Sequence, residues 1–202
     1  MARRSTHTPE ELRQRILEAA QSIIERDGLV GLSAREIARL IDYSPGTLYN
    51  IFENLDEVLL TLQSQMVASL VDELRKTKLG PSTFENIELL SRTYLDFALD
   101  NKRMWNLLFT HYLPQGMNPP QALHDNVNAL SAMVAEVLTG LMPKASRQEI
   151  EIAAKTLWAG VHGITAIAVT DKGPTLNSAT AHIFLKQMTS TYTRGLTAQC
   201  PA

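Results

Sequence analysis

The chain has 202 residues, an apolar share of 45% and a formal net charge of −2. This apolar share excludes a disordered chain, and the charge excludes an overall positive field that would draw the protein to nucleic acid, so any such attraction must come from a local patch. The one cysteine, Cys200, cannot form an internal disulfide, and no apolar run follows the N-terminal arginines as it would in a signal peptide. The most apolar stretch (157–169) is shorter than the ~20 residues of a membrane span. We therefore expect a soluble cytoplasmic protein.

The elements predicted along the chain are all helices. A Ser, Thr or Asn followed three residues later by Glu marks a helix start, because the pair satisfies backbone N–H groups that the first turn leaves free. Such pairs occur at Thr8/Glu11, Ser33/Glu36, Asn54/Glu57, Ser82/Glu85 and Ser146/Glu149. Apolar residues at helical spacing agree, and no segment alternates with a period of two. We therefore predict an all-α fold of about nine helices. They cover 12–24, 33–41, 44–52, 55–76, 84–100, 102–111, 121–141, 147–170 and 177–194.

The helices at 33–41 and 44–52 are too short to bury an apolar face alone. Only a sharp turn at Asp42 separates them, and Asp tolerates the left-handed backbone better than most residues. Ser44 is placed to cap the second helix, and small Ala38 allows the two helices to cross closely. This pattern predicts a helix-turn-helix, whose second helix enters a DNA major groove. Its outward face consists of small or hydrogen-bonding residues, namely Pro45, Gly46, Thr47, Tyr49 and Asn50.

The sequence ILEAAQSIIERDGLVGLSAREIARLIDYSPGTLYNIFENLDEVL (16–59) resembles the TetR family of bacterial transcription regulators. The resemblance rests mainly on Ala19, Ala20, Gly28 and the segments LSAREIA and SPGTLYNIF. It implies an N-terminal three-helix helix-turn-helix DNA-binding domain over 1–54 and a C-terminal helical ligand-binding and dimerisation domain over 55–202. It further implies a ligand-responsive regulator, commonly a repressor, that binds a palindromic operator as a homodimer.

The resemblance also implies DNA contacts, position by position. Thr47 and Tyr49 match residues whose hydroxyls hold phosphates, and Ser33 and Arg35 match positions that meet the DNA backbone. Ser44, Pro45, Gly46 and Asn50 match positions that approach base edges. Arg3 and Arg4 form a short basic arm that is expected to follow the minor groove or phosphates.

Two positions depart from the family pattern. Asp42 stands where the family commonly has Gly, and Leu55 stands where it commonly has a Lys that reaches a phosphate. Acidic residues also roughly balance the arginines of the N-terminal part, so we expect moderate DNA affinity and a shallow salt dependence. For Tyr49 and Phe52 a core position is the alternative, and Arg13, Arg15 and Arg39 are expected to be solvated surface.

The helix at 147–170 is apolar almost all round, which is typical of a helix buried on more than one side. We expect one side to pack on its own domain and the other on a second copy of the chain. Together with the helix at 177–194, it would form a four-helix homodimer interface. The alternative is that it forms the buried centre of a monomer.

Residues 157–163, LWAGVHG, resemble a Trp-x-x-x-His-Gly motif in the C-terminal domain of one TetR subgroup, named WHG. Trp158 and His162 share a helix face because they are four residues apart. With Trp105, Phe109 and Tyr112 they are predicted to bind a small apolar or aromatic effector. The alternative is that the aromatic residues are core and that His162 bonds a backbone carbonyl.

Two other classes of protein compete with a regulator. A helical-bundle enzyme or metal protein is disfavoured because the chain has no HExxH, no Gly-rich phosphate loop and no Gly-x-Ser-x-Gly. We therefore expect no enzymatic activity, no cofactor and no metal, although a metal site between His111 and His124 is conceivable. A helical protein that acts through protein–protein contacts is the other alternative.

Overall fold

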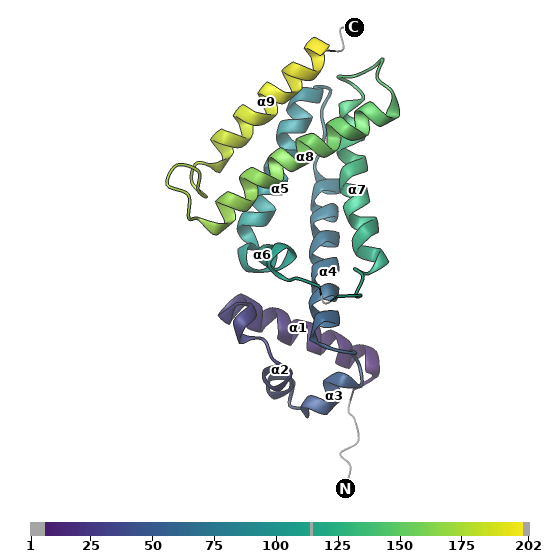
Figure 1. Cartoon of the computed structure of the whole chain (residues 1–202), viewed down its shortest axis with the longest axis vertical. Helices are drawn as coiled ribbons and strands as arrows, with labels where there is room; N and C mark the ends of the chain where they lie inside the picture. The colour runs from purple at the N-terminus through teal and green to yellow at the C-terminus, as the bar shows by residue number, and fades with distance from the viewer. Residues whose placement is uncertain (1–6, 114, 200–202) are drawn as a thin grey trace. The chain divides into compact units, whose positions relative to one another are not determined.

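The computed structural model describes residues 7–113 and 115–199 (Figure 1). Within these residues the chain forms nine α-helices and one 3-10 turn, with no strand, which confirms the predicted fold class. The elements are α1 (Pro9–Asp27), η1 (Leu29–Gly31), α2 (Ala34–Ile41), α3 (Pro45–Tyr49), α4 (Leu55–Lys76), α5 (Thr83–Asp100), α6 (Lys102–Thr110), α7 (Gln121–Leu138), α8 (Arg147–Thr170) and α9 (Ala181–Gln199).

The helix starts marked by capping pairs are confirmed, although not all of the pairs are complete. At Thr8 and Ser146 both bonds of the capping box are present: the hydroxyl accepts the backbone N–H of the Glu three residues on, and the Glu carboxylate accepts the N–H of the cap. At Ser33, Asn54 and Ser82 the side chain accepts the first of these bonds. Each cap satisfies N–H groups that would otherwise lack an intrahelical partner.

Several predicted boundaries differ from the observed ones: α1 extends beyond 12–24 at both ends, α7 ends at Leu138 instead of 141, and α9 ends at Gln199 instead of 194. Two further differences have local reasons. The helix expected over 44–52 is shorter, because after Tyr49 the backbone N–H groups of Asn50 and Ile51 bond three residues back, which tightens the turn. The last helix begins at Ala181 rather than at 177. There the Asn177 side-chain oxygen accepts the N–H groups of Ala179 and Thr180 and so competes with helical bonding.

The described chain divides into two compact units. The first unit contains α1 to α3, α4 as far as Met66, and the segment Arg103–Pro120; the second unit contains Val67–Lys102 and everything from Gln121 on. The sequence predicts a single domain boundary after residue 54, which would assign α6 to the C-terminal domain. The first unit includes nearly all of α6, and two hydrogen bonds join this helix to α4 and α1: the Gln63 amide of α4 donates to the Leu107 carbonyl at 3.0 Å, and Arg103 donates to the Glu25 carbonyl at 2.7 Å.

In the first unit, α2 packs on α1 and α3 packs on α2. Apolar side chains at helical spacing fill the space between them, and each buried Ile or Leu stabilises the fold by roughly 1.5–3 kcal/mol relative to exposure. The principal ones are Ile16, Ala20, Ile23, Ile37, Ala38, Leu48 and Phe52. Asp42 adopts φ 60° and ψ 47°, so the left-handed turn predicted there is confirmed, and Phe52 is a core residue.

In the second unit, α8 packs against α5, α7 and α9 (Figure 1). By length and composition α8 is apolar enough to cross a membrane; the apolar run at 157–169 is only a part of it. Its buried side chains include Ala154, Leu157, Val161 and Ala168, which face its own unit. The same helix leaves Ile152 and Ile167 exposed, so the chain by itself does not cover its whole apolar surface.

Candidate nucleic-acid interface and ligand cavity

The short helix α3 presents its polar side outward. Leu48 is only 1% exposed and anchors the helix in the first unit, whereas Tyr49 is 54% exposed. Ser44, Pro45, Gly46 and Asn50 are also exposed, and Thr47 is half-buried. The outward orientation predicted for this face is therefore confirmed. It carries no charged side chain, so any contacts it makes to a duplex come from hydroxyls, an amide and small apolar groups.

Ser44 does not cap α3 as the sequence indicated. Its hydroxyl makes no capping bond to a backbone N–H. Instead the Ser44 and Thr47 hydroxyl oxygens lie 3.0 Å apart and pair with each other. The first turn of α3 is held by the backbone, since the Thr47 N–H donates to the Ser44 carbonyl at 3.0 Å. Both hydroxyls thus keep hydrogen-bonding capacity on the outer surface.

The turn between α2 and α3 is tied to the start of the chain by a cluster that the sequence did not reveal. His7 Nδ1 lies 2.7 Å from the Tyr43 hydroxyl, and Arg15 Nη1 lies 2.6 Å from His7 Nε2. Arg15 also donates to the Ile41 carbonyl at 3.3 Å. Arg15, expected as solvated surface, is therefore a half-buried structural residue that supports the turn.

Most arginines of the first unit are already engaged. Arg26 and Arg39 both bind Glu36, with Nη2–Oε1 distances of 3.2 and 2.7 Å. The hydrogen bonds from Arg39, and then those from Arg26, lower the pKa of Glu36 to about 2. Arg103 donates to the Glu25 carbonyl at 2.7 Å. Neutralised or held in this way, these guanidinium groups are poorly placed to bind phosphates.

Arg13 is held as well, because its guanidinium lies 4.2 Å from the centre of the Phe52 ring and 3.6 Å from the Glu57 carboxylate. By contrast, Arg35 at the start of α2 is exposed. Within the described part of the first unit, it is the one arginine for which no ion pair or hydrogen bond is found. Ser33, beside it, is half-buried and caps α2. Arg3 and Arg4 lie outside the described residues.

The five residues predicted to bind a ligand are divided between the two units. Trp105, Phe109 and Tyr112 belong to the first unit: Trp105 is buried, its ring centre lies 5.9 Å from that of Phe109, and Tyr112 is exposed. Trp158 and His162 lie on α8 in the second unit, where their rings stack with centres 5.3 Å apart. The structure thus brings Trp105 together with Phe109, and Trp158 together with His162, but it places the two pairs in different units.

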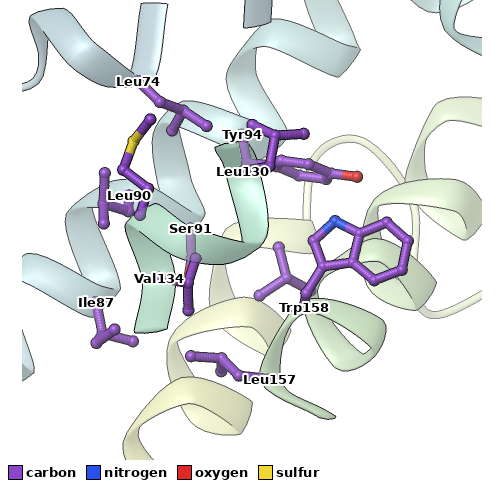
Figure 2. Close-up of a pocket in the computed structure, with 11 residues that line it drawn as sticks. Leu74, Ile87, Leu90, Ser91, Tyr94, Leu130, Val134, Leu157 and Trp158 are labelled. Atoms are coloured by element: carbon purple, nitrogen blue, oxygen red, sulfur yellow. The ribbon is translucent and has the colours of Figure 1, made fainter. Parts of the chain in front are cut away.

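A cavity of about 40 Å³ lies inside the second unit (Figure 2). Trp158 is the one predicted ligand residue among its lining side chains. Helices α4, α5, α7 and α8 contribute the wall, which is almost entirely apolar; its apolar members are Leu74, Ile87, Leu90, Leu130, Met133, Val134, Leu157 and Val161. Two further polar lining residues, Ser91 and Tyr94, come from α5 and were missed, although both lie on its apolar stripe.

His162 reaches the cavity wall through Tyr94. The Tyr94 hydroxyl oxygen and His162 Nδ1 are 3.1 Å apart. Burial raises the pKa of Tyr94 and lowers the pKa of His162, so both groups are neutral at physiological pH. Hydrogen bonding to the Trp158 indole opposes the effect of burial on the pKa of Tyr94. Within the described residues, however, the buried Nε1 of Trp158 has no partner of full hydrogen-bonding geometry.

His111, one half of the conceivable metal site, is engaged in a different network. Its Nε2 lies 2.8 Å from the Asp56 carboxylate and its Nδ1 lies 3.3 Å from the Gln63 amide nitrogen. Over residues 7–113 and 115–199, no group of three or more His, Cys, Asp or Glu side chains is arranged to hold a metal ion.

Comparison with known proteins gives one family. A family model described as tetracyclin repressor-like, C-terminal domain, matches residues 87–191. No curated protein is detectably similar to the chain. The matched residues include the segments of α5, α7 and α8 that line the cavity.

Solved structures share the fold at low sequence identity. A transcriptional regulator from Rhodococcus sp. Rha1 is 20% identical, with a TM-score of 0.70 over 91% of this chain and 96% of that chain. BioQ, crystallised with its natural double-stranded DNA operator, is 19% identical, with a TM-score of 0.64 over 92% and 98%. The TetR family regulator PfmR from Thermus thermophilus is 15% identical, with a TM-score of 0.60 over 89% and 97%.

Proposed function

The chain belongs to the TetR family of transcriptional regulators, and on this premise we propose that it is a cytoplasmic repressor that binds a palindromic operator as a homodimer and is released by a small apolar or aromatic effector. The observation that carries the DNA-binding part is the outward face of α3, held on buried Leu48. The DNA-bound structure of BioQ, which has a similar fold, supports the same use of the first unit.

The proposed DNA contacts follow from chemistry and exposure. Tyr49 and Thr47 donate hydroxyl hydrogens to phosphates. At the start of α2, Arg35 offers an exposed guanidinium group to the DNA backbone, and Ser33 beside it is proposed to contact the backbone as well. Asn50 presents an amide, which pairs well with an adenine edge. Three small residues, Ser44, Pro45 and Gly46, allow α3 to approach bases and thymine methyls closely. Arg3 and Arg4 are proposed to extend these contacts as a basic arm.

The dimer is proposed to form through α8 and α9, which pack side by side (Figure 1). Exposed apolar side chains remain on both helices: Ile152 and Ile167 on α8, Ile183 and Phe184 on α9. A Cβ atom added at Gly163 meets no atom within 4 Å, so the middle of the α8 face is open to a close neighbour. A twofold partner on this face brings a second α3 to the same side of the duplex, roughly 34–36 Å away.

The effector is proposed to act by shifting the equilibrium between two arrangements of the dimer that differ in DNA affinity. Helix α4 contributes to both units and places Leu74 in the cavity wall. A ligand that binds one arrangement of the dimer better than another moves the equilibrium by that difference in affinity and by no more. Typical coupling of roughly 1–3 kcal/mol changes DNA affinity by about 5–150-fold. A saturating cavity ligand that changed neither operator affinity nor the distance between the two α3 helices would contradict this mechanism.

Selection from a pool of random duplexes tests the function directly. Purified protein is mixed with the pool, and the retained sequences are read. We expect enrichment of a palindrome whose half-sites are about one helical turn apart. A variant in which both Tyr49 and Arg35 are Ala is the control and should retain no such sequence. If the unaltered protein enriches no palindrome, the result favours the alternative of a helical protein that acts through protein contacts.

A further inference from the structure

We propose that the cavity of the second unit selects a neutral, mainly apolar ligand with one hydrogen-bond acceptor, such as an aryl ketone, and rejects carboxylates and ammonium ions. This inference rests on the proposed function, because it names the chemical class of the effector. It depends on two polar groups for which no partner of hydrogen-bonding geometry is found within the described residues, Trp158 Nε1 and the Ser91 hydroxyl. It also depends on the absence of charge from the lining side chains.

The indole N–H of Trp158 is the donor that an acceptor ligand would meet. Nε1 is buried, and no group of the described residues accepts its N–H with full hydrogen-bonding geometry, although the indole is close enough to the Tyr94 hydroxyl to lower the pKa of that group. Figure 2 shows the indole nitrogen on the side of the cavity where the Tyr94 hydroxyl lies. A buried donor without an acceptor is unfavourable, and a ligand oxygen that accepts from it removes that penalty. This gain is open to a ketone and not to a hydrocarbon of the same shape.

Ser91 provides the second polar group. Its side chain is 6% exposed and lines the cavity from α5 (Figure 2). No hydrogen bond of its hydroxyl is found within the described residues, whereas many other helical Ser and Thr hydroxyls of this chain bond a carbonyl of the preceding turn, as Thr165 and Thr189 do. The hydroxyl can therefore donate to a ligand oxygen or accept from a ligand hydroxyl.

The wall offers nothing to balance an ionic ligand. None of the lining residues is Asp, Glu, Lys, Arg or His. Burial keeps the phenol of Tyr94 protonated and, beside it, the imidazole of His162 unprotonated. A carboxylate or an ammonium group in this cavity would lose its hydration without gaining a counter-charge, which strongly opposes binding.

The size of the cavity limits the ligand to a small one. Its volume of about 40 Å³ is well below the ~150 Å³ of a cavity known to hold benzene, so a single ring enters only if part of the wall moves. Met133 of α7 is the adaptable lining side chain, because an unbranched thioether changes rotamer easily. Helix α7 is also only partly buried, with Leu130 and Leu138 as its buried residues.

Four probes of similar size separate the chemistries: acetophenone, ethylbenzene, benzoate and benzylammonium. The chain has two tryptophans, so full-length ¹⁵N-labelled protein gives two indole N–H signals, which the Trp105→Phe variant assigns. We expect acetophenone to shift the Trp158 signal saturably and to leave that of Trp105, in the other unit, in place. Benzoate and benzylammonium should move neither signal. An equal Trp158 shift with benzoate, or no shift with acetophenone, overturns the proposal.

A matched variant tests the hydrogen bond itself. Trp158→Phe keeps an aromatic ring and removes the N–H, so calorimetry should show acetophenone binding about tenfold more weakly and ethylbenzene binding unchanged. Ser91→Ala is the second variant, and it should weaken acetophenone binding in the same direction. Equal weakening of both probes by either variant would indicate lost packing and would count against the proposal.

Failure of this inference is distinguishable from failure of the proposed function. If benzoate occupies the cavity and weakens operator binding, the ligand class is wrong and the ligand-responsive regulator stands. If acetophenone shifts the Trp158 signal but no palindromic duplex is bound, the ligand class stands and the DNA-binding function fails.

Discussion

The Tyr94 hydroxyl oxygen lies 3.1 Å from His162 Nδ1, which joins α5 to α8 beside the cavity of the second unit. His162 itself does not line the cavity, and Tyr94 does. The motif histidine therefore contacts a cavity-lining tyrosine that is 68 residues away in sequence. Because Trp158 stacks on the same imidazole, His162 contacts two lining aromatic side chains at once.

The unpaired arginine should control the salt dependence of DNA binding. Arg35→Ala removes a free guanidinium, so the slope of log affinity against log salt should become shallower by about 0.9 for each subunit. Arg39→Ala is the matched control on the same helix. Its guanidinium already binds Glu36 at 2.7 Å, and the slope should stay unchanged. Fluorescence anisotropy across a series of salt concentrations measures both variants, and equal slopes for Arg35→Ala and the unaltered protein would contradict the assignment.

The hydroxyl of Tyr49 should contribute affinity without sequence preference. Tyr49→Phe removes the hydroxyl that is proposed to bond a phosphate, and a hydrogen bond to a charged group typically contributes about 1.5–3 kcal/mol. The reduction should be of similar size for the best operator and for unrelated duplexes. Tyr112→Phe, at an exposed tyrosine of the same unit, is the control and should leave binding unaltered. A loss confined to one operator sequence would instead place Tyr49 at a base edge.

The open glycine of α8 offers a way to block the proposed dimer. Gly163→Trp adds bulk where a Cβ meets no atom within 4 Å of this chain, so each subunit should remain folded while a close partner helix is excluded. Ala122→Trp, at an exposed position of α7, adds the same bulk elsewhere. Analytical ultracentrifugation should find monomers of Gly163→Trp and dimers of the control. A dimeric Gly163→Trp protein would place the interface on another face.

Acid should weaken the ion pairs of Glu36. Its folded-state pKa of about 2 lies below the ordinary value of 4.5, so its contribution to stability is full above pH 4.5 and disappears as the pH falls toward 2. The effect is small because the carboxylate remains partly open to solvent, with 26% of the side chain exposed. Urea midpoints of the unaltered protein and of Glu36→Gln should differ above pH 4.5 and converge toward pH 2. A gap that stays constant across this range would show that the carboxylate charge is not responsible.

Local sequence signals accounted for most of the secondary structure. The capping pairs at Thr8 and Ser146 and the turn at Asp42 depend on residues within a few positions of each other, so their side chains suffice to specify them. The same is true of the outward face of α3, since helical periodicity turns Leu48 inward and Tyr49 outward. The limits of α3 and α9 escaped prediction because side-chain and three-residue bonds compete there with helical ones.

The sequence by itself determined the nine helices of the described residues, the turn at Asp42 and the family, because short-range spacing and capping carry that information. Only the tertiary structure decided that nearly all of α6 belongs with the N-terminal helices, that Glu36 neutralises Arg39 while Arg35 stays free, and that Ser91 and Tyr94 line the cavity instead of Trp105. These outcomes depend on contacts between residues far apart in the chain, and helical periodicity indicates which face of a helix is buried without indicating which helix will cover it.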